Sequence, residues 1–218
     1  MFEEEKMMNH RLTDIIGWSH RLSAEILSPG DLAIDLTAGN GNDTLHLAQC
    51  AVAQERGCVI GFDIQRCALN TSAIHLTEHG FSVAIHPEET AHEALPAAYT
   101  RPDTGVHLFH CGHQHLERHL HRAPKVIIGN LGYLPGANHA ITTSVATTIH
   151  AVEQGLAALL PQGRLILVVY PGHPAGDEEA HALLQFFTKL PKQRWDNITI
   201  GCPNATNAPF LLGAERRR

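Results

Sequence analysis

The chain has 218 residues, of which 44% are hydrophobic and 17% are charged, so it can bury a core and is not wholly disordered. This length predicts a single domain over residues 1–218. The 16 Lys and Arg residues against 22 Asp and Glu residues give a net charge of −6. That charge excludes a non-specific nucleic-acid coat, so any contact with nucleic acid is expected to be local.

The sequence carries no signal for a membrane or for export. No apolar run approaches the roughly 18–20 residues of a membrane span, and the acidic start lacks the apolar segment of a secretory signal. The five cysteines form no C-x-x-C pair, which predicts free thiols in a reducing compartment. We therefore expect a cytoplasmic protein without a membrane partner.

From residue 30 onward, short apolar runs alternate with helical patterns. Helices are expected over residues 12–27, 43–54, 65–78, 116–121, 142–160 and 177–190, and strands over residues 32–36, 59–62, 106–109, 125–128, 164–170, 197–200 and 210–213. This order predicts an α/β fold with a mostly parallel seven-stranded sheet and helices on both faces. The last two strands are joined too closely for a parallel crossover, so they should form an antiparallel hairpin. Residues 1–30 are expected to form a helical cap, and the proline-rich residues 86–104 an insertion.

The turn after the first strand carries the first chemical signal. Gly39 and Gly41 allow a tight turn and a close approach of the backbone to a ligand. Asp63 ends the second strand, 22 residues after Gly41, where an acid can accept both hydroxyls of a ribose. Thr44 replaces the third glycine of a dinucleotide motif, and a carboxylate at Asp35 facing the pocket would repel a pyrophosphate but suit a cationic methionine group. The alternative is a turn that binds no ligand.

Two further turns follow later strands and should open on the same edge of the sheet. Asn130 and Tyr133 stand in an N-x-x-Y pattern after the fourth strand, and His173 follows the fifth strand in Tyr-Pro-Gly-His. His113, after the third strand, should line the cofactor side of the pocket. The alternatives are a packed tyrosine in an ordinary turn and structural histidines.

Histidine is over-represented, with 17 residues, and five of them crowd into residues 110–121. No zinc-binding spacing such as H-E-x-x-H is present. We expect a histidine-rich helix face that titrates with the solvent, and no metal site.

The first turn resembles motif I of class I S-adenosylmethionine-dependent methyltransferases, with Thr37 in place of the first glycine, and N-x-x-Y resembles the N-P-P-Y signature of amino-group methyltransferases. Five stretches together, at residues 37–44, 61–65, 130–136, 141–143 and 170–179, look like a bacterial family formerly described as rRNA methylases. That family includes the methyltransferase that converts 5-aminomethyl-2-thiouridine at the tRNA wobble position to its 5-methylaminomethyl form. This chain departs from the pattern at Gly129 and at residues 137–139.

The resemblance implies a Rossmann-like class I methyltransferase fold, S-adenosylmethionine as cofactor and the anticodon loop of tRNA as partner. A monomer and a homodimer both stay open. It implies cofactor-binding residues Asp35, Thr37, Gly39, Asn40, Gly41, Asn42, Asp43, Asp63, Gln65 and His113, catalytic residues Asn130, Tyr133 and His173, and substrate-binding residues Leu131, Tyr133 and Tyr170.

Three functional alternatives stay open. The methyl acceptor could be a small-molecule amine or rRNA, or the chain could be a nucleoside-binding regulatory protein without turnover. Phosphate contacts of an RNA substrate would fall to Arg11, Arg21 and the arginines at 216–218.

Overall fold

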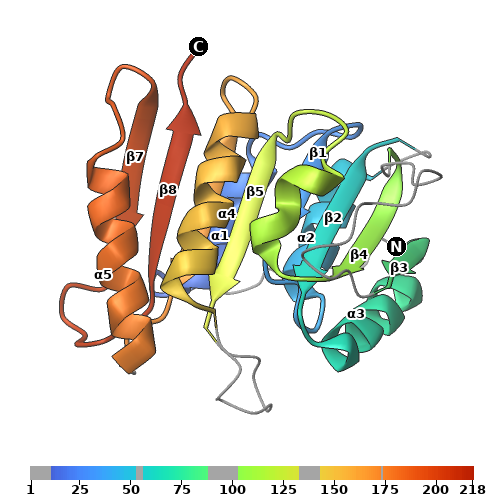
Figure 1. Cartoon of the computed structure of the whole chain (residues 1–218), viewed down its shortest axis with the longest axis horizontal. Coiled ribbons are helices and arrows are strands. Elements are labelled where there is room, and N and C mark those ends of the chain that lie inside the picture. Colours follow the sequence, from blue (N-terminus) through green and yellow to red (C-terminus); the bar gives the residue numbers. More distant parts are fainter. Residues whose placement is uncertain (1–10, 53–55, 88–102, 133–142, 173) are drawn as a thin grey trace, which may run out of the picture.

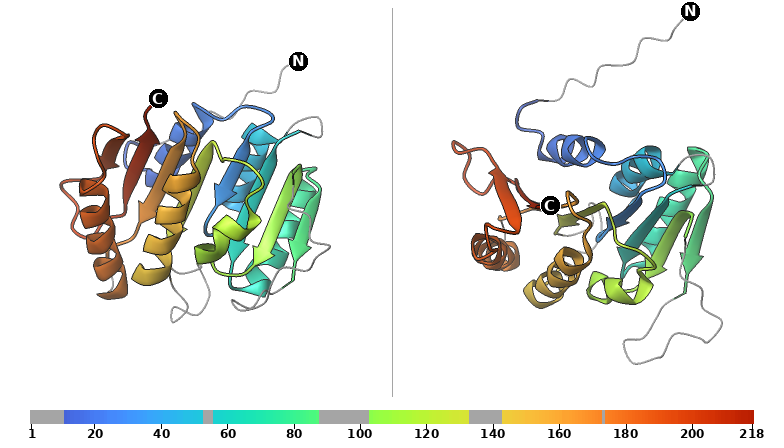
Figure 2. Two further views of the ribbon diagram at one scale, coloured as in Figure 1. Left: turned by 45° about the horizontal axis from the view of Figure 1, so that its top comes forward. Right: turned by 90° about the horizontal axis from the view of Figure 1, so that it is seen from above.

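The computed structural model describes residues 11–52, 56–87, 103–132, 143–172 and 174–218. They form an α/β structure in which one eight-stranded sheet lies between two layers of helices (Figures 1 and 2). The strand order is β3-β4-β2-β1-β5-β6-β8-β7. The strands are β1 (Leu32–Asp35), β2 (Cys58–Asp63), β3 (Val83–His86), β4 (Gly105–His110), β5 (Val126–Leu131), β6 (Arg164–Val169), β7 (Trp195–Ile200) and β8 (Phe210–Arg216).

The central strands are parallel, and only β8 runs against its neighbours. It pairs antiparallel with both β6 and β7, so the predicted closing hairpin is confirmed. The parallel strands β1 and β6 are buried almost end to end, as expected for strands covered on both faces.

Two groups of helices cover the two faces of the sheet. One face carries α1 (Ile15–Ala24), α2 (Asn42–Ala51) and α3 (Arg66–Glu78), and the other carries the 3-10 helix η1 (His113–His119), α4 (Val145–Ala158) and α5 (Pro174–Thr188). Each layer packs on its own hydrophobic core. Asp14 caps α1 by accepting a hydrogen bond from the backbone N–H of Gly17, and Ser144 caps α4. None of these helices is long and apolar enough to cross a membrane.

The expectation of seven strands is wrong by one. Strand β3 follows α3 directly, pairs parallel with β4 and forms one edge of the sheet. It has only four residues, and all of them are partly or fully exposed, so its apolar pattern is weak. His86, which was assigned to the expected insertion, ends this strand, and most of that insertion lies outside the described residues.

The carboxyl ends of the parallel strands meet at one edge of the sheet, the edge at which ligands bind in such folds. Because β8 runs the other way, its end at Arg216 lies at the opposite edge (Figure 1). The arginine tail is therefore not placed beside a site at the carboxyl edge. Arg216 instead donates to the Leu159 carbonyl, and Arg217 pairs with Asp196.

A substitution of Gly41 should destabilise the protein through packing as well as through backbone strain. Gly41 has φ 89°, and a Cβ there would lie 2.5 Å from Ser72 Oγ and 2.9 Å from Ser72 Cα on α3. Gly80 has φ 85° but open space around it, so it is a matched control. Gly80→Ala should cost about 1–2 kcal/mol of unfolding free energy, and Gly41→Ala should cost about 1–3 kcal/mol more. Urea unfolding measures both, and equal losses would contradict this packing.

Candidate functional site

A cleft of about 1290 Å³ opens at the carboxyl edge of the sheet. Its walls come from the segments that follow β1, β2, β4, β5 and β6 and from the start of α4. A second hollow, of about 360 Å³, lies between α5 and β7 and is lined by none of the predicted site residues. The large cleft is therefore the candidate site.

Eight of the ten predicted cofactor residues line this cleft. They are Thr37, Gly39, Asn40, Asn42, Asp43, Asp63, Gln65 and His113. Gly41 does not line it, but its left-handed backbone forms the N-cap of α2 and so shapes the turn.

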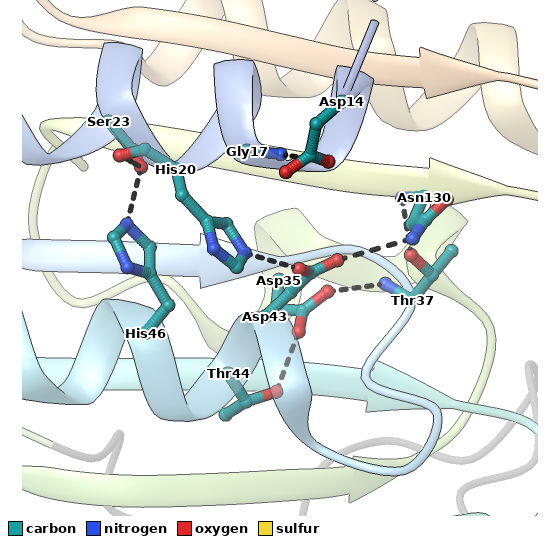
Figure 3. A network of polar contacts seen from close by, with 10 residues as sticks. All are labelled: Asp14, Gly17, His20, Ser23, Asp35, Thr37, Asp43, Thr44, His46 and Asn130. Carbon is teal, nitrogen blue, oxygen red and sulfur yellow. Dashed lines mark hydrogen bonds and ion pairs between the residues drawn. The ribbon is translucent and has the colours of Figure 1, made fainter. Parts of the chain in front are cut away.

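Asp35 corrects one expectation, because its carboxylate does not face the cleft. It is fully buried beneath the turn, where Oδ1 accepts a hydrogen bond from Thr37 N at 3.0 Å and Oδ2 accepts one from Thr44 Oγ1 at 2.6 Å (Figure 3). Burial raises the pKa of the Asp35 carboxyl to about 7, and the charge of Asp43 acts in the same direction. Asp35 therefore shapes the turn instead of contacting a ligand.

Asp63 joins the turns after β1 and β2. Its Oδ2 accepts a hydrogen bond from Gly39 N at 2.9 Å, and its Oδ1 accepts one from Gln65 N at 2.8 Å. Burial raises the pKa of this carboxyl, whereas the two backbone bonds oppose that rise. Each carboxylate oxygen can accept a further hydrogen bond, so Asp63 can still receive two hydroxyl groups from the cleft.

His113 lines the same cleft, and one of its two ring nitrogens lacks a hydrogen-bond partner among the described residues. Its Nδ1 lies 3.0 Å from the Leu36 carbonyl, so Nδ1 carries the proton and donates it. Its Nε2 is buried and has no hydrogen-bond partner among the described residues. Burial lowers the pKa of His113 to about 4, so the ring is neutral at physiological pH. A ligand with an N–H or O–H group can satisfy Nε2.

The expected solvent-titrating histidine face is wrong for at least two of its members. His113 is 8% exposed, and His119 is fully buried. The His119 ring packs against Phe109, with 4.0 Å between ring centroids, and against Phe62. Within the described ranges, no group of three or more His, Cys, Asp or Glu residues is arranged to hold a metal ion.

Asn130, near the end of β5, lines the cleft on the other side of β1 from Asp63 and is held by three neighbours. Its backbone N–H donates to Thr37 Oγ1 at 2.7 Å, and its side-chain Nδ2 donates to Asp43 Oδ2 at 3.5 Å (Figure 3). Its side chain also hydrogen-bonds the hydroxyl of Tyr170, which lines the cleft and whose pKa is raised by burial. The Leu131 side chain is buried in the core, which leaves its backbone to face the cleft. Tyr133 and His173 lie outside the described residues.

Several residues that line the cleft or hold its walls were missed at the level of sequence. Thr143, Ser144 and Thr147 line the cleft at the start of α4. Buried Glu179 on α5 accepts hydrogen bonds from Thr143 and Thr148, both at 2.6 Å, and so holds this helix start. Both Thr143 and Glu179 fall in stretches that carried the family resemblance, which was the available signal. His20 on α1, which donates to Asp43 Oδ1 at 2.7 Å, gave no signal at all.

Comparisons with known proteins agree with one another. The sequence model of the family described as "Putative rRNA methylase" matches residues 59–215. A protein of Arabidopsis thaliana named tRNA (mnm(5)s(2)U34)-methyltransferase, chloroplastic, is 31% identical in an alignment of 204 residues that covers 91% of this chain and 68% of that protein.

Two solved structures are similar over nearly their whole length. A protein of Clostridium thermocellum, described in the same words as the family, is 30% identical, with 93% of this chain and 97% of that chain covered and a TM-score of 0.78. A "putative methyltransferase" from Streptococcus mutans in complex with SAH is 31% identical, with 96% and 99% covered and a TM-score of 0.75.

The buried Asp35 carboxyl should make stability depend on pH. Its folded pKa of about 7 lies above the value of about 3.9 in an unfolded chain, so the folded state binds the proton more tightly. The wild-type protein should therefore lose stability as pH rises from about 4 through about 7. Asp35→Asn has no titrating group at this position, so its stability should not fall for this reason. In urea unfolding, the stability of Asp35→Asn relative to wild type should improve by about 2–3 kcal/mol between pH 5 and pH 8. A difference that is the same at both pH values would contradict the assignment.

Proposed function

Since this chain belongs to the rRNA methylase family and has the methyltransferase fold, we propose that it N-methylates a tRNA wobble uridine. The reaction converts 5-aminomethyl-2-thiouridine to 5-methylaminomethyl-2-thiouridine. The name of the 31% identical Arabidopsis relative supports this substrate.

The cofactor is S-adenosylmethionine, which when bound supplies a methyl group on a positively charged sulfur. The cleft residues fit this group: Asp63 has acceptor capacity for the two ribose hydroxyls, and the bare Nε2 of His113 can accept one hydrogen bond from the nucleoside. Gly39 brings backbone close to the same place. Asp43 adds a negative charge that suits a cationic methionine group.

The position of Asn130 on the cleft wall carries the proposal of an amine substrate. An alkylamine has a pKa of about 10.4, so at neutral pH it is mostly protonated and lacks a free lone pair. The Asn130 carbonyl and the Leu131 backbone carbonyl can each accept one N–H bond, which favours the neutral amine and aims its lone pair. Tyr133 stacking on the base and His173 receiving the proton remain predictions.

The acidic net charge is compatible with RNA if recognition is confined to an anticodon loop. Sequence-specific RNA recognition often uses unstacked single-stranded bases, which are held by stacking and by contacts to their edges. One of the arginines proposed for phosphate contact, Arg21, is exposed on α1. Its guanidinium lies over the ring of Trp18, 5.2 Å from the ring centroid.

The proposal is tested with tRNA from a bacterial strain whose wobble uridine stops at the 5-aminomethyl stage. Purified protein with methyl-labelled cofactor should label this tRNA, and nucleoside mass spectrometry should find the 5-methylaminomethyl product. Parallel reactions contain rRNA or small primary amines. Transfer only to these acceptors would refute the tRNA assignment, and cofactor binding without any transfer would indicate a regulatory protein.

Asn130→Ala should lower kcat on this tRNA by about 100-fold or more, because positioning dominates a transfer from an already activated donor. Its Kd for the cofactor, measured by calorimetry, should stay within about twofold. Asn70→Ala, at an exposed position on α3, is the matched control and should behave as wild type. Near-normal turnover of Asn130→Ala would refute an amine-aiming role.

Asp63→Ala should weaken cofactor binding by about ten- to a hundredfold, because losing a charged hydrogen-bond acceptor costs about 1.5–3 kcal/mol. Since Asp63 also ties the Gly39 and Gln65 backbones together, thermal unfolding should accompany the calorimetry. Glu78→Ala, at the exposed end of α3, controls for the loss of one negative charge. Unchanged affinity in a folded Asp63→Ala protein would exclude the ribose contact.

A further inference from the structure

Helix α1 carries His20, whose side chain is linked to Asn130 through a single intermediate residue, Asp43. His20 Nε2 donates to Asp43 Oδ1 at 2.7 Å, and Asp43 Oδ2 accepts from Asn130 Nδ2 at 3.5 Å (Figure 3). The side chains of His20 and Asp43 are only 23% and 14% exposed, so water competes weakly for both bonds. Three elements, α1, α2 and β5, are thereby joined at the cleft.

The His20 ring is itself held in place. It stacks on His46 with ring centroids 4.0 Å apart and planes 6° apart. His46 Nε2 lies 2.9 Å from the hydroxyl of Ser23, which is fully buried on α1. Burial and the proximity of His20 lower the pKa of His46 to about 4. His46 is therefore uncharged at neutral pH, and the His20 ring stacks on a neutral ring. His20 is therefore positioned by packing before any substrate arrives.

The two oxygens of Asp43 bond to partners on different elements. A carboxylate only accepts hydrogen bonds, so the amide of Asn130 must turn its NH₂ group toward Asp43. The carbonyl oxygen of the same amide is then directed away from Asp43. That carbonyl is the atom which an amine substrate needs, so the direction of the amide decides whether Asn130 can aim a lone pair.

We propose that His20 is a positioning residue for methyl transfer: it holds Asp43, which in turn fixes the Asn130 amide with its carbonyl oxygen turned away from Asp43, where it can accept from the substrate amine. The inference rests on the proposed function for the identity of that amine. His20 lies before the segment matched by the family model and outside every motif that carried the resemblance.

The test compares His20→Ala with His20→Gln, which keeps an N–H donor at a similar reach, and with His79→Ala, an exposed histidine after α3. His20→Ala should lower kcat about tenfold, while KM for the tRNA and Kd for the cofactor change less than about twofold. His20→Gln should recover most of the lost kcat. His79→Ala should match wild type.

A double variant separates positioning from general support of the fold. If His20 acts through Asn130, then His20→Ala should cause less than about twofold further loss of kcat in the Asn130→Ala background. If His20→Ala only loosened the packing of α1, it would instead lower the thermal midpoint and weaken cofactor binding in both the wild-type and the Asn130→Ala backgrounds. Wild-type kcat in His20→Ala, or full additivity of the two losses, would overturn the proposal.

A readout without turnover distinguishes failure of this inference from failure of the proposed function. The side-chain ¹⁵N–¹H signals of Asn130, identified by their loss in Asn130→Ala, should shift in His20→Ala and stay in place in His79→Ala. Unshifted signals in His20→Ala would overturn the positioning role. If the signals shift but wild-type protein labels no tRNA, the positioning stands and the tRNA assignment falls.

Discussion

A buried carboxylate is the constraint on which the rest of the site depends. Asp35 has no solvent around it, and such burial is costly unless hydrogen bonds compensate. Thr37 N and Thr44 Oγ1 supply them, and in doing so they hold the start and the end of the turn between β1 and α2. The turn is thus shaped from below, which leaves its upper surface free to form the cleft wall.

From this turn, hydrogen bonds run to both halves of the cleft. Asp63 accepts the backbone N–H of Gly39 on the side that we propose for the cofactor, and Thr37 Oγ1 accepts the backbone N–H of Asn130 on the side that we propose for the substrate. The distance between the two halves therefore depends on one short segment. This spacing matters for methyl transfer, because the attacking atom must lie in line with the methyl group and the sulfur that leaves it. A misplacement of about 1 Å can lower the rate by about 100-fold.

The abundance of histidine has a structural explanation in the described residues. Neutral histidine rings pack as flat, hydrogen-bonding groups, as His119 does against Phe109 and His46 does against His20. His86 stacks on Phe109 as well and hydrogen-bonds His107 at 3.0 Å. Partial or full burial lowers the pKa of His46, His86 and His113 to about 4, so these rings stay uncharged at neutral pH.

The sequence by itself determined the alternation of strands and helices, the closing hairpin and the place of the cleft-lining motifs at strand ends. These features depend on local periodicity and on the topology of parallel sheets, and both can be predicted from the order of apolar and polar residues along the chain. Asp63 and Asn130 were identified on that basis, and both line the cleft.

Only the tertiary structure decided that β3 joins the sheet edge, that Asp35 points into the core, that His113 has a buried Nε2 without a partner among the described residues, and that His20 reaches Asp43. Each of these depends on the direction of a side chain or on a pairing between distant segments, and such contacts are set by packing between elements, which local pattern does not encode.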